Sequence, residues 1–258
     1  MAQEQGDVRV VRTEDELLEL LDGLFAQARR ERAPRHADRS RPVPALSGKP
    51  DESLADLLDR GVIGASPGGR GLDLGCGNGR NTLHLRMHGF AMDGLDRDQR
   101  ALDQARSRQE QFEYHLGFDL GVRFHHGDAF GPVAAALTGP YDLVYDSGLF
   151  QHLPPHRRPG YLALLARLTA PGGHLGLVCC APDGDGAGTR TPDAQLYRDG
   201  APHGAPAYTA DELRRIFVEG PLGLQEVELR RMRDESAPDA SRFGRPGLWA
   251  ALFRRPER

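Results

Sequence analysis

Apolar runs alternate with amphipathic stretches along the middle of the chain, a pattern typical of strand and helix units around a mostly parallel sheet. Strands are predicted at residues 71–74, 90–95, 122–126, 143–146 and 175–180, and helices at residues 80–88, 98–114, 157–168 and 209–218. Two later apolar runs, 224–232 and 248–254, are joined by a polar loop and predict an antiparallel pair of strands. The pattern therefore indicates an α/β domain.

The first 50 residues form a separate region, an N-terminal helix and lid. Leucine and phenylalanine recur at helical spacing between residues 13 and 33, and Thr13 and Glu16 have the spacing of a capping box. Residues 34–50 are rich in proline and arginine, which predicts a loop. We expect this region to fold over the functional site, with a dimer interface as the alternative; the sequence allows a monomer or a homodimer.

Residues 51–258 are expected to form one main domain, opened by a short helix at residues 51–60. Within it, residues 181–208 have the composition of a long loop, and their length marks a substrate-covering insertion. The side chains of this insertion that we expect to contact a substrate are Tyr197, Arg198, His203 and Tyr208.

Composition excludes several classes of protein. The 258 residues carry a formal net charge of -4, and no apolar run approaches the roughly 20 residues that cross a bilayer. A membrane span is excluded on this ground, and a strongly basic nucleic-acid binder is disfavoured. The first residues lack a signal segment and the three cysteines include an adjacent pair, so we expect a cytoplasmic protein with reduced thiols. No His/Cys spacing is typical of a metal site, and we expect no metal.

The strongest motif is a glycine loop that follows the first predicted strand and opens a helix, with the sequence LDLGCGNGR from residue 72 to residue 80. Glycines let the backbone turn tightly and approach a ligand, while the helix N-terminus offers free N–H groups. A dinucleotide-binding loop reads G-x-G-x-x-G, and its third glycine would stand where this chain has Arg80. The spacing argues against a nicotinamide cofactor.

Acidic residues follow the next predicted strands. Asp96 ends the second strand, where its carboxylate can accept hydrogen bonds from both hydroxyls of a ribose. Asp128 follows the third strand and can accept from an exocyclic amine such as that of adenine. The fourth strand ends at Asp146, and residues 146–152 should face the reacting centre because ligands of such folds lie outside the carboxyl ends of the strands.

Together, the runs LDLGCGNGRN, GLDRD, HHGDAF and YDLVYDSGLFQHLPPHRRPGY resemble the class I S-adenosylmethionine-dependent methyltransferases. They are similar in particular to the branch that contains tellurite-resistance and thiopurine or thiol methyltransferases. The resemblance implies a Rossmann-like sheet of seven strands, the last of them antiparallel, with helices on both faces and an N-terminal helical cap. The thiopurine-type motif has arginine after the strand-four acid, where this chain has Ser147.

The resemblance also implies a cofactor, S-adenosylmethionine, which leaves as S-adenosylhomocysteine. The residues it assigns to cofactor binding are Asp73, Gly75, Cys76, Gly77, Asn78, Gly79, Asp96, Arg97, Asp128, Ala129, Asp146, Ser147 and Phe150. Of these, Asp128 and Ala129 would hold the adenine and Asp146 to Phe150 would flank the sulfonium.

Methyl transfer from a sulfonium is an in-line displacement that needs alignment and exclusion of water. His152 and Asp146 are the candidate catalytic groups, and Ser147 and His152 are also candidates for acceptor binding; His152 is either a general base or a cap of the following helix. We expect a small-molecule acceptor, a thiol or other soft nucleophile, with an oxygen or nitrogen acceptor as the alternative. A nicotinamide-dependent oxidoreductase and a non-catalytic binding module are the competing hypotheses. The absence of an Asn-Pro-Pro-Tyr-like tetrapeptide after strand four argues against methylation of nucleic-acid bases.

Overall fold

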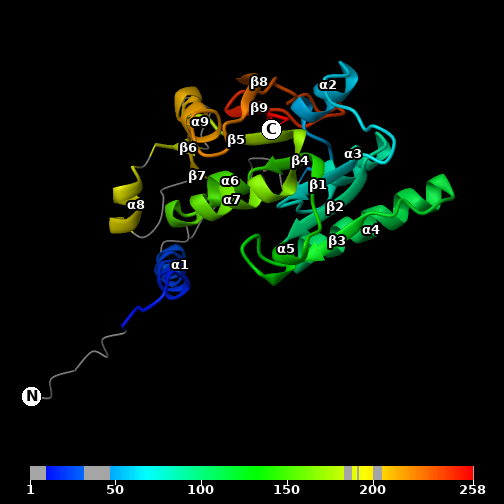
Figure 1. The fold of residues 1–258 in the computed structure, drawn as a ribbon. Helices are drawn as coiled ribbons and strands as arrows, with labels where there is room; N and C mark the ends of the chain where they lie inside the picture. Colours follow the sequence, from blue (N-terminus) through cyan, green and yellow to red (C-terminus); the bar gives the residue numbers. More distant parts are fainter. Residues whose placement is uncertain (1–9, 32–46, 183–187, 191, 200–204, 258) are drawn as a thin grey trace, which may run out of the picture.

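The computed structural model describes residues 10–31, 47–182, 188–190, 192–199 and 205–257. The centre of the fold is a seven-stranded sheet with the order β3–β2–β1–β4–β5–β9–β8 (Figure 1). Its strands are β1 (Arg70–Leu74), β2 (Ala91–Asp96), β3 (Arg123–His126), β4 (Tyr141–Ser147), β5 (Thr169–Cys180), β8 (Gln225–Arg231) and β9 (Leu248–Arg254). Each of them coincides with a predicted strand.

The strands β1 to β5 pair in parallel, and β9 is antiparallel to both of its neighbours, β5 and β8. The predicted antiparallel pair at the C-terminal end is confirmed. From β1 the chain adds β2 and β3 on one side, whereas β4 and β5 extend the sheet on the other side. The strand order therefore reverses between β1 and β4, and the crevice outside their carboxyl ends is the expected position for a ligand.

The helices alternate with the strands, as predicted. They are α1 (Glu14–Glu31), α2 (Glu52–Asp59), α3 (Arg80–Met87), α4 (Gln99–Leu116), α5 (Pro132–Ala136), α6 (Leu149–His152), the 3-10 turn η2 (Pro155–Arg157), α7 (Arg158–Leu168), α8 (Asp193–Asp199) and α9 (Ala210–Phe217). The insertion also contains a small parallel pair, β6 (Gly188–Thr189) and β7 (Ala205–Pro206). The predicted capping box of Thr209 and Glu212 opens α9.

Short elements were missed by the periodicity. The helices α5, α6 and α8 are too short to show a full apolar period, so no helix was predicted there. Strand β5 begins at Thr169 rather than at residue 175, and it includes the Pro171-Gly172-Gly173 turn. Thr169 pairs with Tyr141 across a register shift in β4, and this irregular pairing accommodates the turn within the strand.

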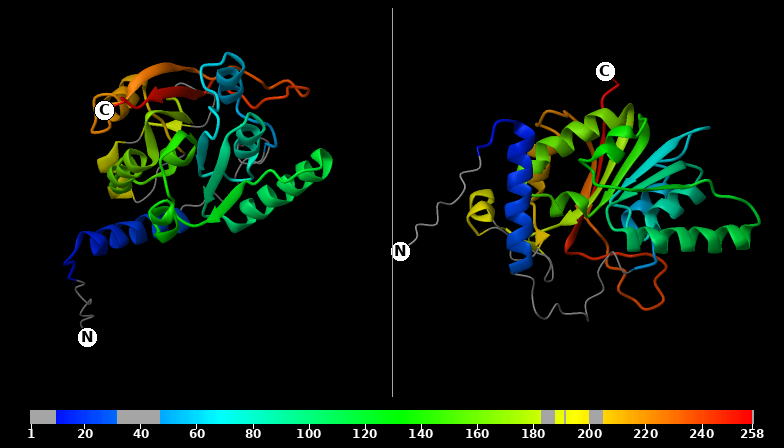
Figure 2. Two further views of the ribbon diagram at one scale, coloured as in Figure 1. Left: turned by 45° about the vertical axis from the view of Figure 1, so that its right-hand side comes forward. Right: turned by 90° about the horizontal axis from the view of Figure 1, so that it is seen from below.

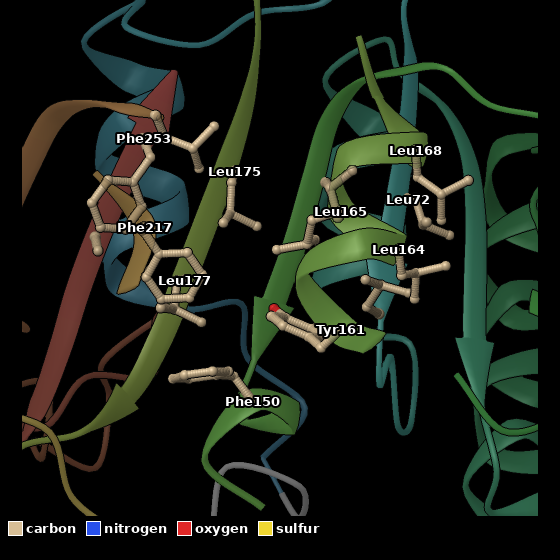
Figure 3. Packing of buried hydrophobic residues seen from close by; sticks show 14 of the residues in the cluster. Leu72, Phe150, Tyr161, Leu164, Leu165, Leu168, Leu175, Leu177, Phe217 and Phe253 are labelled. Atoms are coloured by element: carbon tan, nitrogen blue, oxygen red, sulfur yellow. The ribbon is translucent and has the colours of Figure 1, made fainter. Parts of the chain in front are cut away.

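Apolar side chains cover both faces of the sheet. On one face α7 and α9 contribute Tyr161 and Phe217 to a core that includes Phe150 and Phe253, and Figure 3 shows these rings among the leucines of the strands. The other core takes its helical side chains from α2 and α3. Each fully buried phenylalanine contributes about 1.5–3 kcal/mol. The predicted arrangement of helices on both faces is confirmed.

Helix α1 lies apart from the sheet and contacts the turn η2 (Figure 2). Thr13 Oγ1 accepts from the Glu16 amide at 3.2 Å, so the helix begins where the sequence predicted. Most of the predicted lid, residues 32–46, lies outside the described residues. No helix in the described part of the chain is long and apolar enough to span a membrane.

Candidate active site

The glycine loop joins β1 to α3 at the reversal of the strand order. Gly75, Gly77 and Gly79 have φ angles of +73°, +53° and +73°, in the left-handed region that other residues rarely adopt. A Cβ atom at Gly75 would lie 3.0 Å from Leu149, and one at Gly79 would lie 2.9 Å from Ala105. A Cβ atom at Gly77 would meet no described atom within 4 Å. The outer two glycines therefore permit packing, whereas Gly77 borders open space.

Asp96, at the carboxyl end of β2, fixes the shape of this loop. Its Oδ2 atom accepts from the Gly77 amide at 2.8 Å, and its Oδ1 atom accepts from the Asp98 amide at 2.8 Å. Asp98 in turn caps α4 by accepting from the Arg100 amide at 2.9 Å. The structure thus brings together the glycine loop and the acid that the sequence paired with it. A carboxylate oxygen has two lone pairs, so Asp96 retains acceptor capacity for ligand hydroxyls.

The segment before α2 docks on the helix that follows the loop. The Ser47 carbonyl accepts from Asn78 Nδ2 at 3.0 Å, and the Lys49 carbonyl accepts from Arg80 Nη1 at 2.9 Å. These bonds join residues more than 30 positions apart in the chain. Asn78 was predicted as a cofactor residue, and here its amide binds the segment that leads out of the predicted lid.

Arg80 is a site residue that the sequence reasoning did not single out. Its side chain is buried, forms an ion pair with Asp51 Oδ1 at 2.7 Å, and donates to Ser147 Oγ at 3.1 Å. Asp51 Oδ2 also accepts from the Tyr145 hydroxyl at 2.9 Å. A buried pair of this kind requires further hydrogen bonds to offset desolvation, and these partners supply them. The network joins the segment before α2, the start of α3 and the end of β4. The only feature of the sequence that pointed to Arg80 was its place at the third-glycine position of a dinucleotide-binding loop.

Asp146 completes the turn after β4. Its carboxylate has no exposed surface and accepts from the Leu149 amide at 2.7 Å, the Phe150 amide at 3.0 Å and the Tyr161 hydroxyl at 2.6 Å. Burial raises the pKa of Asp146 to about 7, although these hydrogen bonds oppose the rise. The carboxylate therefore orients α6, and its predicted contact with a cofactor or an acceptor remains a prediction.

Asp73 is the second buried acid of the site. Its Oδ2 atom accepts from Thr82 Oγ1 at 2.6 Å, which joins β1 to α3. Burial raises the pKa of Asp73 to about 7. Its neighbour across the loop, Cys76, is also buried, and burial raises the pKa of the Cys76 thiol well above its usual value. A neutral thiol in this position packs the loop and is a poor nucleophile.

The predicted adenine side lies after β3. Asp128 is exposed, and its Oδ1 atom accepts from the Phe130 amide at 2.8 Å. The Arg157 guanidinium lies 5.1 Å from the centre of the Phe130 ring, and Ala129 is half-buried beside it. Arg97 is exposed after β2, with its carbonyl 3.1 Å from the ring nitrogen of His126. An acceptor oxygen beside an apolar ring suits a flat heterocycle with an exocyclic amine.

Two consecutive arginines bind acidic residues of α1 and α8. Arg157 forms an ion pair with Asp22 of α1, which also lies 2.8 Å from the ring nitrogen of His156. Arg158 Nη1 lies 2.9 Å and 2.8 Å from the two carboxylate oxygens of Asp193 on α8. The start of α7 thus anchors both the N-terminal helix and the insertion.

The predicted acceptor side lies after β4 and β5. His152 is exposed at the end of α6, with its Nε2 atom 3.5 Å from Gln151 Nε2. Gln151 Oε1 accepts from the Cys180 amide at 2.5 Å, which joins α6 to the end of β5. Gln151 was not predicted, because a glutamine in so short a helix carries no spacing signal.

The predicted substrate residues of the insertion are only partly described. Tyr208 is buried, and its ring lies 4.9 Å from that of Phe150. Tyr197 and Arg198 belong to α8, but their side chains lie outside the described residues, as does the whole of His203. Tyr208 is therefore the one predicted substrate residue of the insertion whose surroundings the structure describes.

His125 and the two adjacent cysteines of β5 lie in structural surroundings. His125 lies 2.8 Å from Asp93 Oδ1, in line with a structural histidine. Cys179 and Cys180 are buried, and burial raises the pKa of Cys180 to about 11. Within the described residues, no three His, Cys, Asp or Glu side chains are grouped to hold a metal ion.

Comparison with known proteins identifies a methyltransferase domain within the chain. Residues 72–173 match the family model of a methyltransferase domain, which spans the glycine loop, Asp96 and the turn after β4. The chain contains a class I methyltransferase domain. S-adenosylmethionine is the cofactor of this family, and solved neighbours hold S-adenosylhomocysteine. The residues present fit such a group, because Gly77 leaves open space beside the loop and Asp96 offers carboxylate oxygens.

Individual relatives extend the similarity beyond the matched segment. The chain is 27% identical over 157 residues to the 2-heptyl-1-hydroxyquinolin-4(1H)-one methyltransferase of Mycobacteroides abscessus, covering 60% of this chain and 63% of that protein. The structure described as "Conversion of a Disulfide Bond into a Thioacetal Group during Echinomycin Biosynthesis" has 27% identity and a TM-score of 0.58, covering 83% of this chain and 86% of the other. TehB from Haemophilus influenzae shares the fold at 18% identity and a TM-score of 0.52, covering 78% of this chain and 62% of that one.

The curated relatives are longer than the matched part. The chain spans 49%, 50% and 63% of the lengths of three of the curated proteins it matches. The family model covers residues 72–173 of the chain, and the acceptor is a matter of inference.

Proposed function

We propose that this protein transfers the methyl group of S-adenosylmethionine to a small-molecule acceptor. The observation that carries the proposal is the open space beside Gly77, at the reversal of the strand order, next to a loop that Asp96 holds in place. A backbone with free space on its outer side lets a ligand approach more closely than any side chain would allow. The methyltransferase family model, which matches residues 72–173, supports it, as does a methyltransferase relative.

When bound, the cofactor supplies an electrophilic methyl carbon on a sulfonium. Asp96 would bind the ribose hydroxyls, and Asp128 with Phe130 would hold the adenine. Asp146 orients the turn of α6, since its carboxylate accepts from the amides of Leu149 and Phe150. Alignment of donor and acceptor supplies most of the rate, because a displacement of this kind needs no covalent intermediate.

The acceptor atom is a soft nucleophile in this proposal, a thiol or a related group. A thiol ionises close to neutral pH and needs little help from a base, whereas a hydroxyl needs a positioned one. The solved relative of the echinomycin pathway acts on a disulfide, which is sulfur chemistry. His152 is the exposed group that would serve as the base if the acceptor were a hydroxyl.

Titration calorimetry with S-adenosylmethionine and S-adenosylhomocysteine tests the cofactor. We expect micromolar binding by the wild type and at least a tenfold loss in Asp96→Ala, because the substitution removes both the ribose acceptor and the bond to the Gly77 amide. Asp98→Ala is the matched control: it removes a helix cap at a cost of about 1 kcal/mol in stability and leaves the loop bond intact.

Nicotinamide dinucleotides serve as the competing ligands in the same titration. The proposal fails if they bind and the sulfonium pair does not. It also fails if Asp96→Ala and Asp98→Ala bind S-adenosylhomocysteine equally well.

A further inference from the structure

Tyr208 lies at the junction of the insertion and the sheet. Its amide donates to the Cys180 carbonyl at 3.0 Å, which places the residue at the carboxyl end of β5. Its ring packs on Phe150 of α6, and the residue is only 6% exposed. The Trp249 indole donates to the Tyr208 carbonyl at 2.7 Å, so the backbone is held on both sides. Tyr208 is therefore fixed beside α6, on the acceptor side of the crevice.

Two buried donors here lack partners among the described residues. They are the Tyr208 hydroxyl and Arg158 Nε. Burial raises the pKa of Tyr208 to about 12, against the opposing effect of the Arg158 guanidinium, so the hydroxyl keeps its proton at neutral pH and can donate. The guanidinium carbon lies 5.6 Å from the centre of the Tyr208 ring. Buried hydrogen-bond donors normally have an acceptor. Two neighbouring buried donors without one therefore indicate that a ligand supplies the acceptor.

Arg158 binds Asp193 through one nitrogen only. Both hydrogen bonds to Asp193 come from Nη1, and the Asp193 side chain is 52% exposed, so water competes for this carboxylate. The Nε atom of the same guanidinium is buried and has no hydrogen-bond partner among the described residues. Arginine binds carboxylates best through two parallel N–H donors, and the Nε edge offers that geometry.

We infer that the methyl acceptor carries a carboxylate, which binds the Nε edge of Arg158 and the hydroxyl of Tyr208. This inference rests on the proposed function and names its substrate class. Arg158 is one of the two donors, and its pair with Asp193 joins it to α8. A carboxylate here accepts from both donors, whereas the corresponding amide places an N–H donor against them.

Two matched pairs of probes test the inference: thiosalicylate with thiosalicylamide, and 3,4-dihydroxybenzoate with 3,4-dihydroxybenzamide. Binding to the full chain saturated with S-adenosylhomocysteine is measured by calorimetry, so the readout does not depend on turnover. We expect each acid to bind at least tenfold more tightly than its amide. Tyr208→Phe should weaken the acids about fivefold or more and leave the amides unchanged, and Arg158→Gln should abolish the preference for the acids.

The variant Tyr208→Phe also separates a binding role from a structural one. The ring, its packing on Phe150 and the backbone bonds all remain, and an unsatisfied hydroxyl is removed, so the melting temperature should stay the same or rise. Tyr114→Phe, at a tyrosine that is 86% exposed on α4, is the control and should change neither affinity.

The inference is overturned if the wild type binds acid and amide equally, if it binds neither acid, or if Tyr208→Phe weakens both members of a pair alike. Each of these results counts against the inference alone when S-adenosylhomocysteine still binds. Failure of S-adenosylhomocysteine itself to bind overturns the proposed function, and this inference with it.

Discussion

Replacing Gly77 by alanine separates the strain of the glycine loop from its use as a binding surface. Gly77 has a φ angle of +53°, and a Cβ atom there would meet no described atom within 4 Å. The substitution therefore costs the folded state only backbone strain, about 1–2 kcal/mol for a left-handed residue. In a chain of this size that cost lowers the melting temperature by about 2–8 °C.

Gly117 provides a matched control for this strain. It caps α4 with a φ angle of +76°, and a Cβ atom there would also meet nothing within 4 Å. Gly117→Ala and Gly77→Ala should therefore lose similar stability in thermal melts. Only Gly77→Ala should lose affinity for S-adenosylhomocysteine in calorimetry, because the added methyl group occupies the open space beside the loop.

We expect the affinity of Gly77→Ala to fall at least tenfold, which corresponds to about 1.4 kcal/mol. Its amide still donates to Asp96, so loss of the loop itself does not account for such a fall. Equal affinity of the two alanine variants would refute the reasoning, because the space beside Gly77 would then not hold the cofactor.

Three further predictions concern pH, the N-terminal helix and the acceptor. Burial raises the pKa of Asp73 to about 7, so the folded state keeps a proton that the unfolded chain releases above about pH 4. The free energy of unfolding therefore falls as the pH rises from about 4 to about 7, and this contribution is constant above pH 7. In Asp73→Asn this decline should shrink by at most about 3 kcal/mol between pH 5 and pH 8 in urea unfolding, because only about two pH units of the window lie above pH 5. An unchanged decline contradicts the argument. Asp22→Ala removes the carboxylate that pairs with Arg157, so α1 should be cleaved faster in limited proteolysis. The control Asp15→Ala, in the exposed first turn of the same helix, should be cleaved like the wild type. His152→Ala should slow methylation of a phenol at least tenfold and that of a thiol much less, and an equal effect on both would assign His152 a structural role.

The sequence anticipated the elements that are long enough to show a period. The strands from β1 to β4 and the helices α3, α4 and α7 lie where apolar spacing predicted them, and the glycine loop and Asp96 meet as their spacing implied. Short helices such as α6 and α8 were missed, because one or two turns carry no complete apolar period.

The candidate site was anticipated only in part. Asp146 was chosen for its position after a strand, yet its carboxylate is engaged by the turn that it orients. Arg80 and Gln151 were passed over, since their partners Asp51 and Cys180 lie about 30 residues away in the chain. Side-chain direction and distant partners depend on the packed fold, which local spacing does not encode.

The sequence by itself determined the α/β architecture, the glycine loop and the acid that supports it, because local geometry and periodicity specify these features within a few residues. Only the tertiary structure decided which side chains make their hydrogen bonds within the protein and which keep donors or acceptors for a ligand. Burial and hydrogen bonding between distant segments engage Asp146 and Arg80, and the same packing leaves the donors of Arg158 and Tyr208 unsatisfied.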